Sequence, residues 1–186
     1  MPSICFTGHR DILEDKEVLS RHLYNRLENA VKYGITDFYA GGAVGWDTLA
    51  ALTVIKLRRS YPHIKLHLVL PCPPEEQSRG WSQSDRTILY ETIRAADTVE
   101  KVCSHYTYDC MKKRNAKLVE YGDFCLCYFD PDKSKSGTGQ TVRMAQRKPI
   151  KLLNFWHYHY NEYLLDAQRK NIRLPTSQRR RHTSIN

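Results

Sequence analysis

Short apolar runs alternate with longer stretches of helical periodicity along most of the chain. The apolar runs end at glycine, proline or polar residues and predict strands at residues 4–7, 37–40, 65–70, 98–103, 124–129 and 150–154. Between them, residues such as Leu19, Leu23 and Leu27 recur four apart. This spacing predicts helices at residues 14–32, 46–59, 82–96, 109–121 and 140–146.

Strands that alternate with helices predict an α/β fold, a Rossmann-like three-layer sandwich with a mostly parallel central sheet. The length of 186 residues fits one domain, which we place at residues 1–154. Residues 155–186 are aromatic and basic, and we expect a C-terminal extension with a short helix at 160–168 and a disordered end. The proline-rich segment 71–80 is expected to be a functional loop or a lid.

Composition favours a cytoplasmic protein without a membrane partner. Hydrophobic residues make up 41% of the chain, and no apolar run approaches the roughly 20 residues that span a bilayer. The first residues lead directly into a strand and lack the basic and apolar regions of a signal peptide. Without an export signal, the six cysteines are expected to be free thiols, mostly buried. Cys103, His105 and Cys110 lack a second pair of ligands, so no metal site is expected.

The net charge of +9 is concentrated at the end of the chain. Six basic residues and no acidic residue follow Asp166, which leaves 9 − 6 = +3 for the rest of the protein. Nucleic acid is therefore an unlikely partner of the body. The tail is expected to be a solvated end, with weak phosphate binding as the alternative.

Three segments that follow predicted strands combine glycine with polar residues. In an open parallel sheet such segments meet at the carboxyl ends of the strands, where glycine amides and helix N-termini favour anions. They match neither the Walker pattern nor the dinucleotide Gly-x-Gly-x-x-Gly pattern. The candidate phosphate-binding residues are Thr7, Gly8, His9 and Arg10, then Gly41, Gly42, Ala43, Gly45 and Asp47, and finally Gly137, Thr138 and Gly139.

These segments carry a resemblance to a known family. Over residues 3–154 the chain resembles the YpsA-like branch of the SLOG superfamily. The motifs that carry the resemblance are Thr7-Gly8-His9-Arg10, Gly41-Gly42-Ala43-x-Gly45-x-Asp47, Arg114-Asn115 and Ser136-Gly137-Thr138. That superfamily is related to the cytokinin-activating phosphoribohydrolases and to the Rossmann core of DprA. The resemblance implies a phosphorylated nucleotide or an NAD-derived small molecule as ligand and a homo-oligomer as assembly. It implies no further cofactor.

The resemblance also assigns roles by position, each with an alternative. Glycines of the second segment, together with Gly137 and Thr138, would hold phosphate, and Arg10 would face the same site or be an exposed loop cation. Asp47 would accept a ribose hydroxyl or only complement the helix dipole. Arg114 and Asn115 would reach phosphate or ribose, or belong to a solvated helix face.

Trp81 and His9 are weaker candidates. Trp81 follows the proline-rich segment and would stack on a base, or else pack onto the protein surface. His9 titrates near neutrality in principle, but no carboxylate or cysteine partner is recognisable in the sequence.

The sequence leaves a binding protein and an enzyme as competing functions. A sensor, carrier or sequestering protein is favoured over a hydrolase that cleaves the N-glycosidic bond of nucleoside monophosphates. In the hydrolase relatives a catalytic glutamate lies three residues after the Gly-Thr threonine, whereas this chain has Thr141 there. A threonine cannot stabilise an oxocarbenium ion by charge, although Asp47 or Asp85 would be alternative carboxylates.

Overall fold

Six parallel strands form the central sheet of the computed structural model, which describes residues 2–148 and 150–156. The strands follow the spatial order β4-β3-β2-β1-β5-β6, and every neighbouring pair is parallel. The predicted Rossmann-like α/β fold is confirmed. The strands are β1 (Ser3–Gly8), β2 (Asp37–Ala40), β3 (Lys65–Leu70), β4 (Thr98–Lys101), β5 (Phe124–Tyr128) and β6 (Lys151–Asn154).

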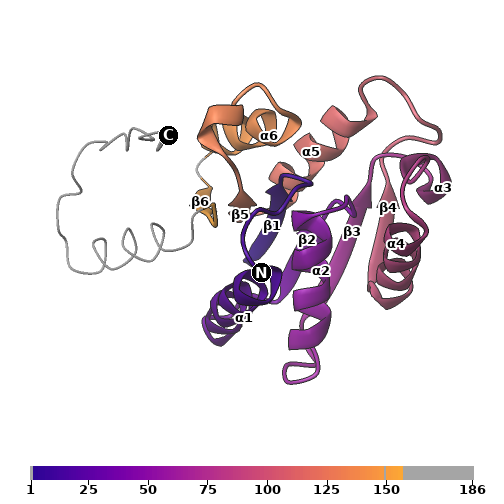
Figure 1. Ribbon diagram of the computed structural model, residues 1–186. Helices are drawn as coiled ribbons and strands as arrows, with labels where there is room; N and C mark the ends of the chain where they lie inside the picture. The colour runs from indigo at the N-terminus through magenta and orange to yellow at the C-terminus, as the bar shows by residue number, and fades with distance from the viewer. Residues whose placement is uncertain (1, 149, 157–186) are drawn as a thin grey trace, which may run out of the picture.

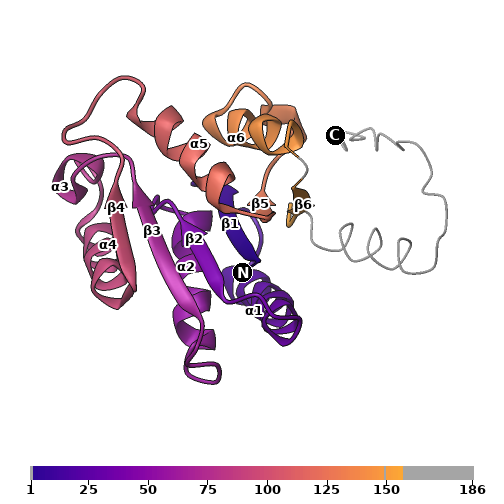
Figure 2. The same ribbon diagram turned by 180° about the vertical axis from the view of Figure 1, so that it is seen from behind.

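Helices cover both faces of the sheet (Figures 1 and 2). One face carries α1 (Lys16–Lys32), α2 (Trp46–Leu57) and α4 (Gln83–Ala95), and the other carries α5 (Cys110–Tyr121) and α6 (Gly137–Gln146). Two short elements, α3 (Pro74–Gln77) and the 3-10 helix η1 (Pro131–Lys133), lie in connections. This arrangement is the one that right-handed crossovers give when the chain adds strands first on one side of β1 and then on the other.

The central strand β1 joins two apolar clusters. Phe6 points toward the cluster beneath α1 and α2, which includes Phe38 and Leu23. Cys5 points the opposite way, toward Cys125 and the residues under α5 and α6. Successive side chains of a strand alternate between faces, so a strand with helices on both sides is apolar throughout.

The six cysteines are all free thiols, and five of them are buried, as predicted. Within the described ranges, no group of three or more metal-ligating side chains has a geometry suited to a metal ion. In the same ranges, none of the helices combines the length and apolarity that crossing a bilayer requires.

Several element boundaries differ from the sequence prediction, and three of the differences lie near the candidate site or its connections. Segment 71–80, expected to be a loop, contains α3, because Pro74 occupies the first helical turn, where its missing N–H costs nothing. Helix α6 begins at Gly137 rather than at residue 140, because the Ser136 hydroxyl accepts the amide of Gly139 at 3.1 Å. Strand β4 ends at Lys101, two residues early, although the Val102 amide still donates to Leu70.

The first residues after the edge strand β6 pack against aromatic side chains of α2 and β5. Phe155 and Trp156, which the predicted boundary assigns to the extension, pack with ring centroids 5.1 Å from Trp46 and Tyr128 respectively. The predicted helix 160–168 and the predicted disordered end lie outside the described residues.

Candidate functional site

The carboxyl ends of β2, β1 and β5 lie side by side in the sheet. The crossovers diverge at β1, because β2 follows on one side of it and β5 is added on the other. In doubly wound sheets such a switch point is where ligands bind. We call the segments that follow these three strands, together with Arg114 of α5, the strand-end site.

The segments after β1 and β2 are in direct contact. The amide of Trp46 donates to the His9 carbonyl at 3.2 Å. Gly45 has a φ of +89°, and a Cβ there would overlap with the backbone of Arg10. A Cβ at Gly8 would overlap with the Trp46 side chain. The predicted site residues Gly8, His9, Arg10 and Gly45 therefore lie at the contact between the two segments, which Trp46 helps to form, while the Arg10 side chain remains exposed.

A buried ion pair lies against the end of β2. Arg114 Nη1 donates to Asp47 Oδ2 at 2.9 Å, and the two side chains are only 9% and 5% exposed. A Cβ at Gly41 would overlap with Arg114 Nη1, so the glycine makes room for the guanidinium. The predicted alternative of a solvated helix face is wrong for Arg114, because the side chain is buried against the β2 segment.

Burial raises the pKa of the Asp47 carboxyl above its ordinary value, and Arg114 together with the amides of Ala43 and Gly41 offsets part of this rise. The Ala43 amide approaches Asp47 Oδ2 at 3.5 Å. Asp47 lies in the first turn of α2, as predicted, where a negative charge complements the helix dipole. Its main partner is nevertheless Arg114. Neither role that the sequence suggested for Asp47, the ribose acceptor or the complement to the helix dipole, included this ion pair.

Arg114 has donors that the protein does not use. Its Nη1 holds Asp47, its Nη2 has only the weak acceptor Met111 Sδ at 4.0 Å, and its buried Nε has no hydrogen-bond partner among the described residues. An unpaired buried donor is costly unless a bound water or ligand satisfies it.

Gln77 of α3 supports the β2 segment and was missed by the sequence analysis. Its Nε2 donates to the carbonyl of Gly42 at 2.9 Å and approaches that of Gly41 at 3.4 Å. Its Oε1 is buried and has no partner in the described part of the chain. The only sequence signal was a proline at a possible helix start, Pro74, because four residues are too few to show periodicity.

His9 connects the segments after β1 and β5. Its Nε2 accepts the amide of Asp130 at 3.0 Å, which places the proton of the neutral ring on Nδ1. Burial lowers the pKa of the His9 imidazole, and the charge of Lys133 lowers it further. The ring also lies 5.9 Å from Phe129 between centroids. His9 is thus a neutral positioning group at the switch point.

The third predicted segment forms the first turn of α6. Gly137 is exposed, and a Cβ there would meet nothing within 4 Å, whereas a Cβ at Gly139 would overlap with the Ser134 carbonyl. Because α6 follows β5, the structure places this turn on the other side of β1 from Gly41 and Gly42. Thr138 is half-buried beside it.

The remaining candidates occupy different surroundings. Thr7 is buried near the end of β1, and Asn115 is 8% exposed on α5 beside Arg114. Trp81 is half-buried on the turn between α3 and α4, where its amide donates to the Ser78 carbonyl at 3.0 Å.

Comparisons with known proteins agree on the family. UPF0398 protein BH1768 of Halalkalibacterium halodurans is 29% identical over 132 residues, covering 69% of this chain and 66% of that protein, just under two thirds. UPF0398 protein YpsA of Bacillus subtilis is 25% identical over 140 residues, covering 71% and 76%.

A solved structure shares the fold. DNA processing protein A (DprA) from Streptococcus pneumoniae aligns with a TM-score of 0.58 at 14% identity, over 95% of this chain and 59% of that one. The sequence profile of the YspA SLOG family matches residues 5–158, which include the first two segments of the strand-end site, Arg114 and the α6 turn. The resemblance inferred from those motifs is thereby confirmed, and the chain belongs to the YspA SLOG family.

Proposed function

We propose that the strand-end site binds a phosphorylated nucleotide or an NAD-derived small molecule, and that the protein acts as a sensor, carrier or sequestering protein. The observation that carries this proposal is Arg114, a cation that Asp47 fixes at the end of β2 and whose Nε has no hydrogen-bond partner in residues 2–148 and 150–156. A guanidinium with free donors is suited to phosphate or ribose oxygens. The exposed start of α6 adds amides and the positive end of a helix dipole.

Binding is favoured over hydrolysis by the state of the nearby polar groups. Thr141, at the position of the relatives' glutamate, is fully buried, and its hydroxyl donates to the Gly137 carbonyl at 3.0 Å. Asp47 is engaged by Arg114, and Asp85 Oδ2 accepts the Ser82 hydroxyl at 2.6 Å. Each carboxylate suggested as a substitute thus has a structural partner of its own.

Calorimetric titration with AMP, NAD and ADP-ribose tests the proposal. We expect saturable binding that weakens in Arg10→Ala and in Gly137→Val, since neither change meets close contacts, yet both alter the proposed phosphate environment. Arg59→Ala removes an exposed arginine at the end of α2 and serves as the control. Gly42 is a poor probe because φ is +67° and a Cβ there would lie 2.7 Å from Leu70 Cδ2. Equal affinity in all four proteins contradicts the proposed location.

The same titrations, followed by chromatography of the products, test the competing function. We expect no release of free base from nucleoside monophosphates at ordinary enzymatic rates, because Thr141 carries no charge and both Asp47 and Asp85 are engaged by structural partners. Turnover that is lost in Asp47→Asn would establish the hydrolase instead.

The domain division at residue 154, the homo-oligomeric assembly and the cytoplasmic location belong to the same proposal. The switch-point site is built within one sheet, so we expect binding to be retained when residues after Leu174 are removed. Sedimentation velocity of the full chain measures its oligomeric state, and the same measurement on the truncated chain shows whether the tail contributes to that assembly.

A further inference from the structure

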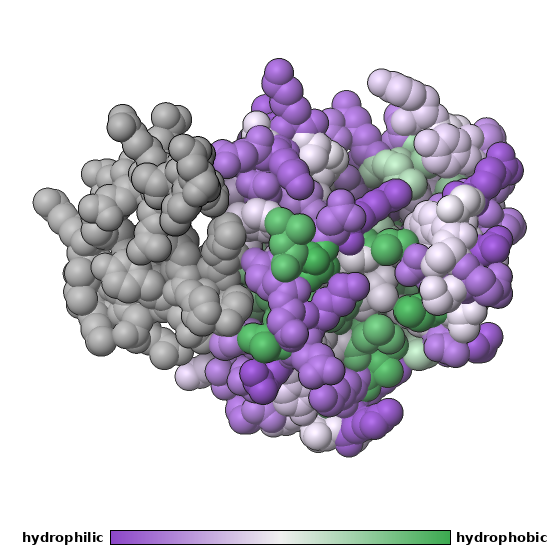
Figure 3. All heavy atoms as spheres, in the orientation of Figure 1, coloured by the Kyte–Doolittle hydropathy of each residue, from purple (hydrophilic) through white to green (hydrophobic). Residues whose placement is uncertain are grey.

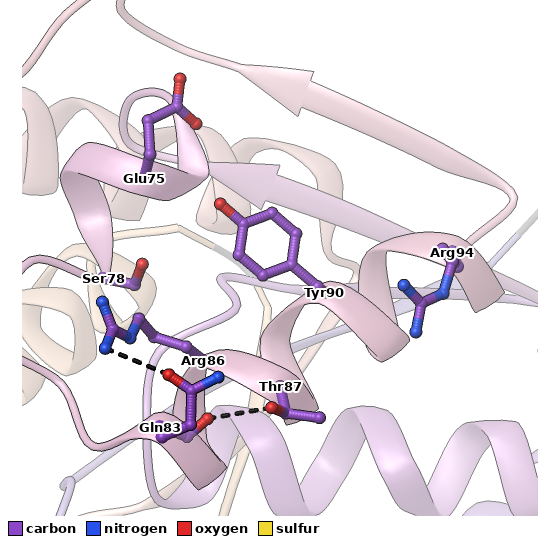
Figure 4. Close-up of a pocket in the computed structure, with 7 residues that line it drawn as sticks. All are labelled: Glu75, Ser78, Gln83, Arg86, Thr87, Tyr90 and Arg94. Atoms are coloured by element: carbon purple, nitrogen blue, oxygen red, sulfur yellow. Dashed lines mark hydrogen bonds between the residues drawn. The ribbon is translucent and has the colours of Figure 1, made fainter.

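A second, separate pocket lies between α3 and α4. Its volume is about 470 Å³, within the range of small-molecule sites. Its lining comes from α3, the following turn and one face of α4 (Figure 4). We call it the α4 pocket, and the residues that line it are Glu75, Ser78, Gln83, Arg86, Thr87, Tyr90 and Arg94.

Two arginines flank an aromatic ring in this pocket. Arg86, Tyr90 and Arg94 are four residues apart on α4 and therefore lie on the same face of the helix. Tyr90 is 39% exposed, and Figure 4 shows that its ring projects from α4 toward the side of the pocket on which Glu75 lies. Large aromatic side chains that are left exposed beside cations are suited to stacking on a flat ring.

Neither guanidinium of the α4 pocket lies in an ion pair within the part of the chain that the structure describes. Arg86 Nη2 donates to the neutral Gln83 Oε1 at 3.3 Å, and no carboxylate of the described ranges forms an ion pair with Arg86 or Arg94. The planar fork of arginine matches carboxylate and phosphate oxygens. The pocket therefore presents two free anion-binding groups around an aromatic face.

Glu75 limits the charge of the ligand. Its carboxylate lies on the α3 side of the pocket and would repel a polyphosphate or a nucleic-acid strand. It would accept hydrogen bonds from sugar hydroxyls, as would the Gln83 amide and the Thr87 hydroxyl. We infer that the α4 pocket is a second ligand site, selective for a nucleoside monophosphate whose phosphate meets Arg86 or Arg94 and whose base stacks on Tyr90.

Helix α3 connects this pocket to the strand-end site. Glu75 and Ser78 line the pocket, while Gln77 between them holds the Gly42 carbonyl. Glu76 accepts the Tyr106 amide at 2.6 Å and anchors the same helix from a third side. Occupation of the α4 pocket is therefore placed to act on the β2 segment through Gln77.

Amide NMR of the full-length protein titrated with AMP tests this site. We expect saturable shifts of the amides of residues 83–94, and a dissociation constant raised about tenfold or more in Arg86→Ala/Arg94→Ala, which loses charge-assisted hydrogen bonds. Tyr90→Ala should weaken binding and Tyr90→Phe should not. Ribose 5-phosphate, which has no base, should bind more weakly than AMP. Arg59→Ala is the matched control, and circular dichroism verifies that each variant is folded.

The two sites are distinguishable in the same experiment. In Arg10→Ala/Gly137→Val the shifts of residues 83–94 should persist, even if the strand-end site is lost or never bound AMP. An unchanged dissociation constant in the double arginine variant, equal affinity for ribose 5-phosphate, or loss of the 83–94 shifts in Arg10→Ala/Gly137→Val would each overturn the second site.

Discussion

At Gly41 the missing side chain decides where Arg114 lies. The guanidinium occupies the space that a Cβ would fill, and Asp47 holds it there. Gly137 is the opposite case, because the space around its Cα is open. These two glycines come from different segments of the predicted phosphate site. Gly41 leaves space for a packed side chain, whereas Gly137 leaves the backbone exposed.

Substitution of these two glycines by alanine should therefore have opposite consequences. Gly41→Ala should displace Arg114 and leave Asp47 buried without its partner, which costs about 3 to 5 kcal/mol when a buried pair is broken. Gly137→Ala should change stability by less than about 1 kcal/mol, since alanine is the better helix former. Urea unfolding of the two variants measures their free energies of unfolding. Similar losses of stability would contradict the prediction, because they would show that Arg114 can move aside without destabilising the protein.

At the level of elements, the starts of helices determine which amides are available. The N-cap residue of α2 is Gly45, which offers no side-chain cap, and the Trp46 amide donates to the His9 carbonyl. The N-cap residue of α6 is Ser136, whose hydroxyl accepts the Gly139 amide, while Gly137 remains exposed. The exposed backbone amides of the predicted phosphate site are thus a feature of α6 more than of α2.

The N-cap of α6 is testable by itself. Ser136→Ala removes the acceptor of the Gly139 amide and should lower the free energy of unfolding by about 1 kcal/mol. Ser134→Ala is the matched control, because the contact that Ser134 makes with Arg143 uses its backbone carbonyl. Chemical denaturation of both variants gives the comparison, and equal stability would mean that water replaces the cap.

The strands β1 to β6, the helices of ten or more residues and their order could be predicted from the sequence, because apolar runs end at turn signals and apolar residues recur at helical spacing. Helix α3 could not, since a single turn shows no period. The Asp47–Arg114 pair could not either, because its partners are 67 residues apart and meet only when α2 and α5 pack against the sheet. The sequence did identify the glycines of the site. Why position 41 needs a glycine could not be predicted, because the side chain that fills the space there is Arg114.

Over the whole molecule, the two faces of the sheet differ in polarity. The face beneath α1, α2 and α4 is apolar, whereas the opposite side of β2, β3 and β4 carries a polar row. At the outer surface, on the side seen in Figure 1, hydrophobic residues lie among hydrophilic ones (Figure 3). In the polar row, His67 lies between Asp37 at 2.9 Å and Thr98 at 2.8 Å, and Tyr39 stacks on it at 4.6 Å between ring centroids. Hydrogen bonds across three strands replace packing there.

This polar row should make stability depend on pH in acid. Burial acts to raise the pKa of the Asp37 carboxyl, but Thr36 and His67 outweigh it and leave the pKa below its ordinary value. The contribution of Asp37 is therefore complete above the pKa of an unfolded aspartate, about 3.9, and is lost as the pH falls through the folded pKa. Thermal unfolding of wild type and Asp37→Asn between pH 6 and pH 2.5 should show a stability gap that narrows below about pH 4. A gap of constant size would refute this linkage.

The central place of β1 has a consequence for synthesis on the ribosome. Ser3 of β1 bonds to Asp123 beside β5, across 120 residues of sequence. At about 5 to 20 residues per second, β1 waits roughly 6 to 24 seconds for that partner after it has been made. During this interval β2, β3 and β4 can assemble on one side of β1, while the backbone N–H and C=O groups along its other edge have no partner strand. The nascent chain therefore passes through a half-built sheet with β1 at its open edge, although β1 lies in the interior of the finished sheet.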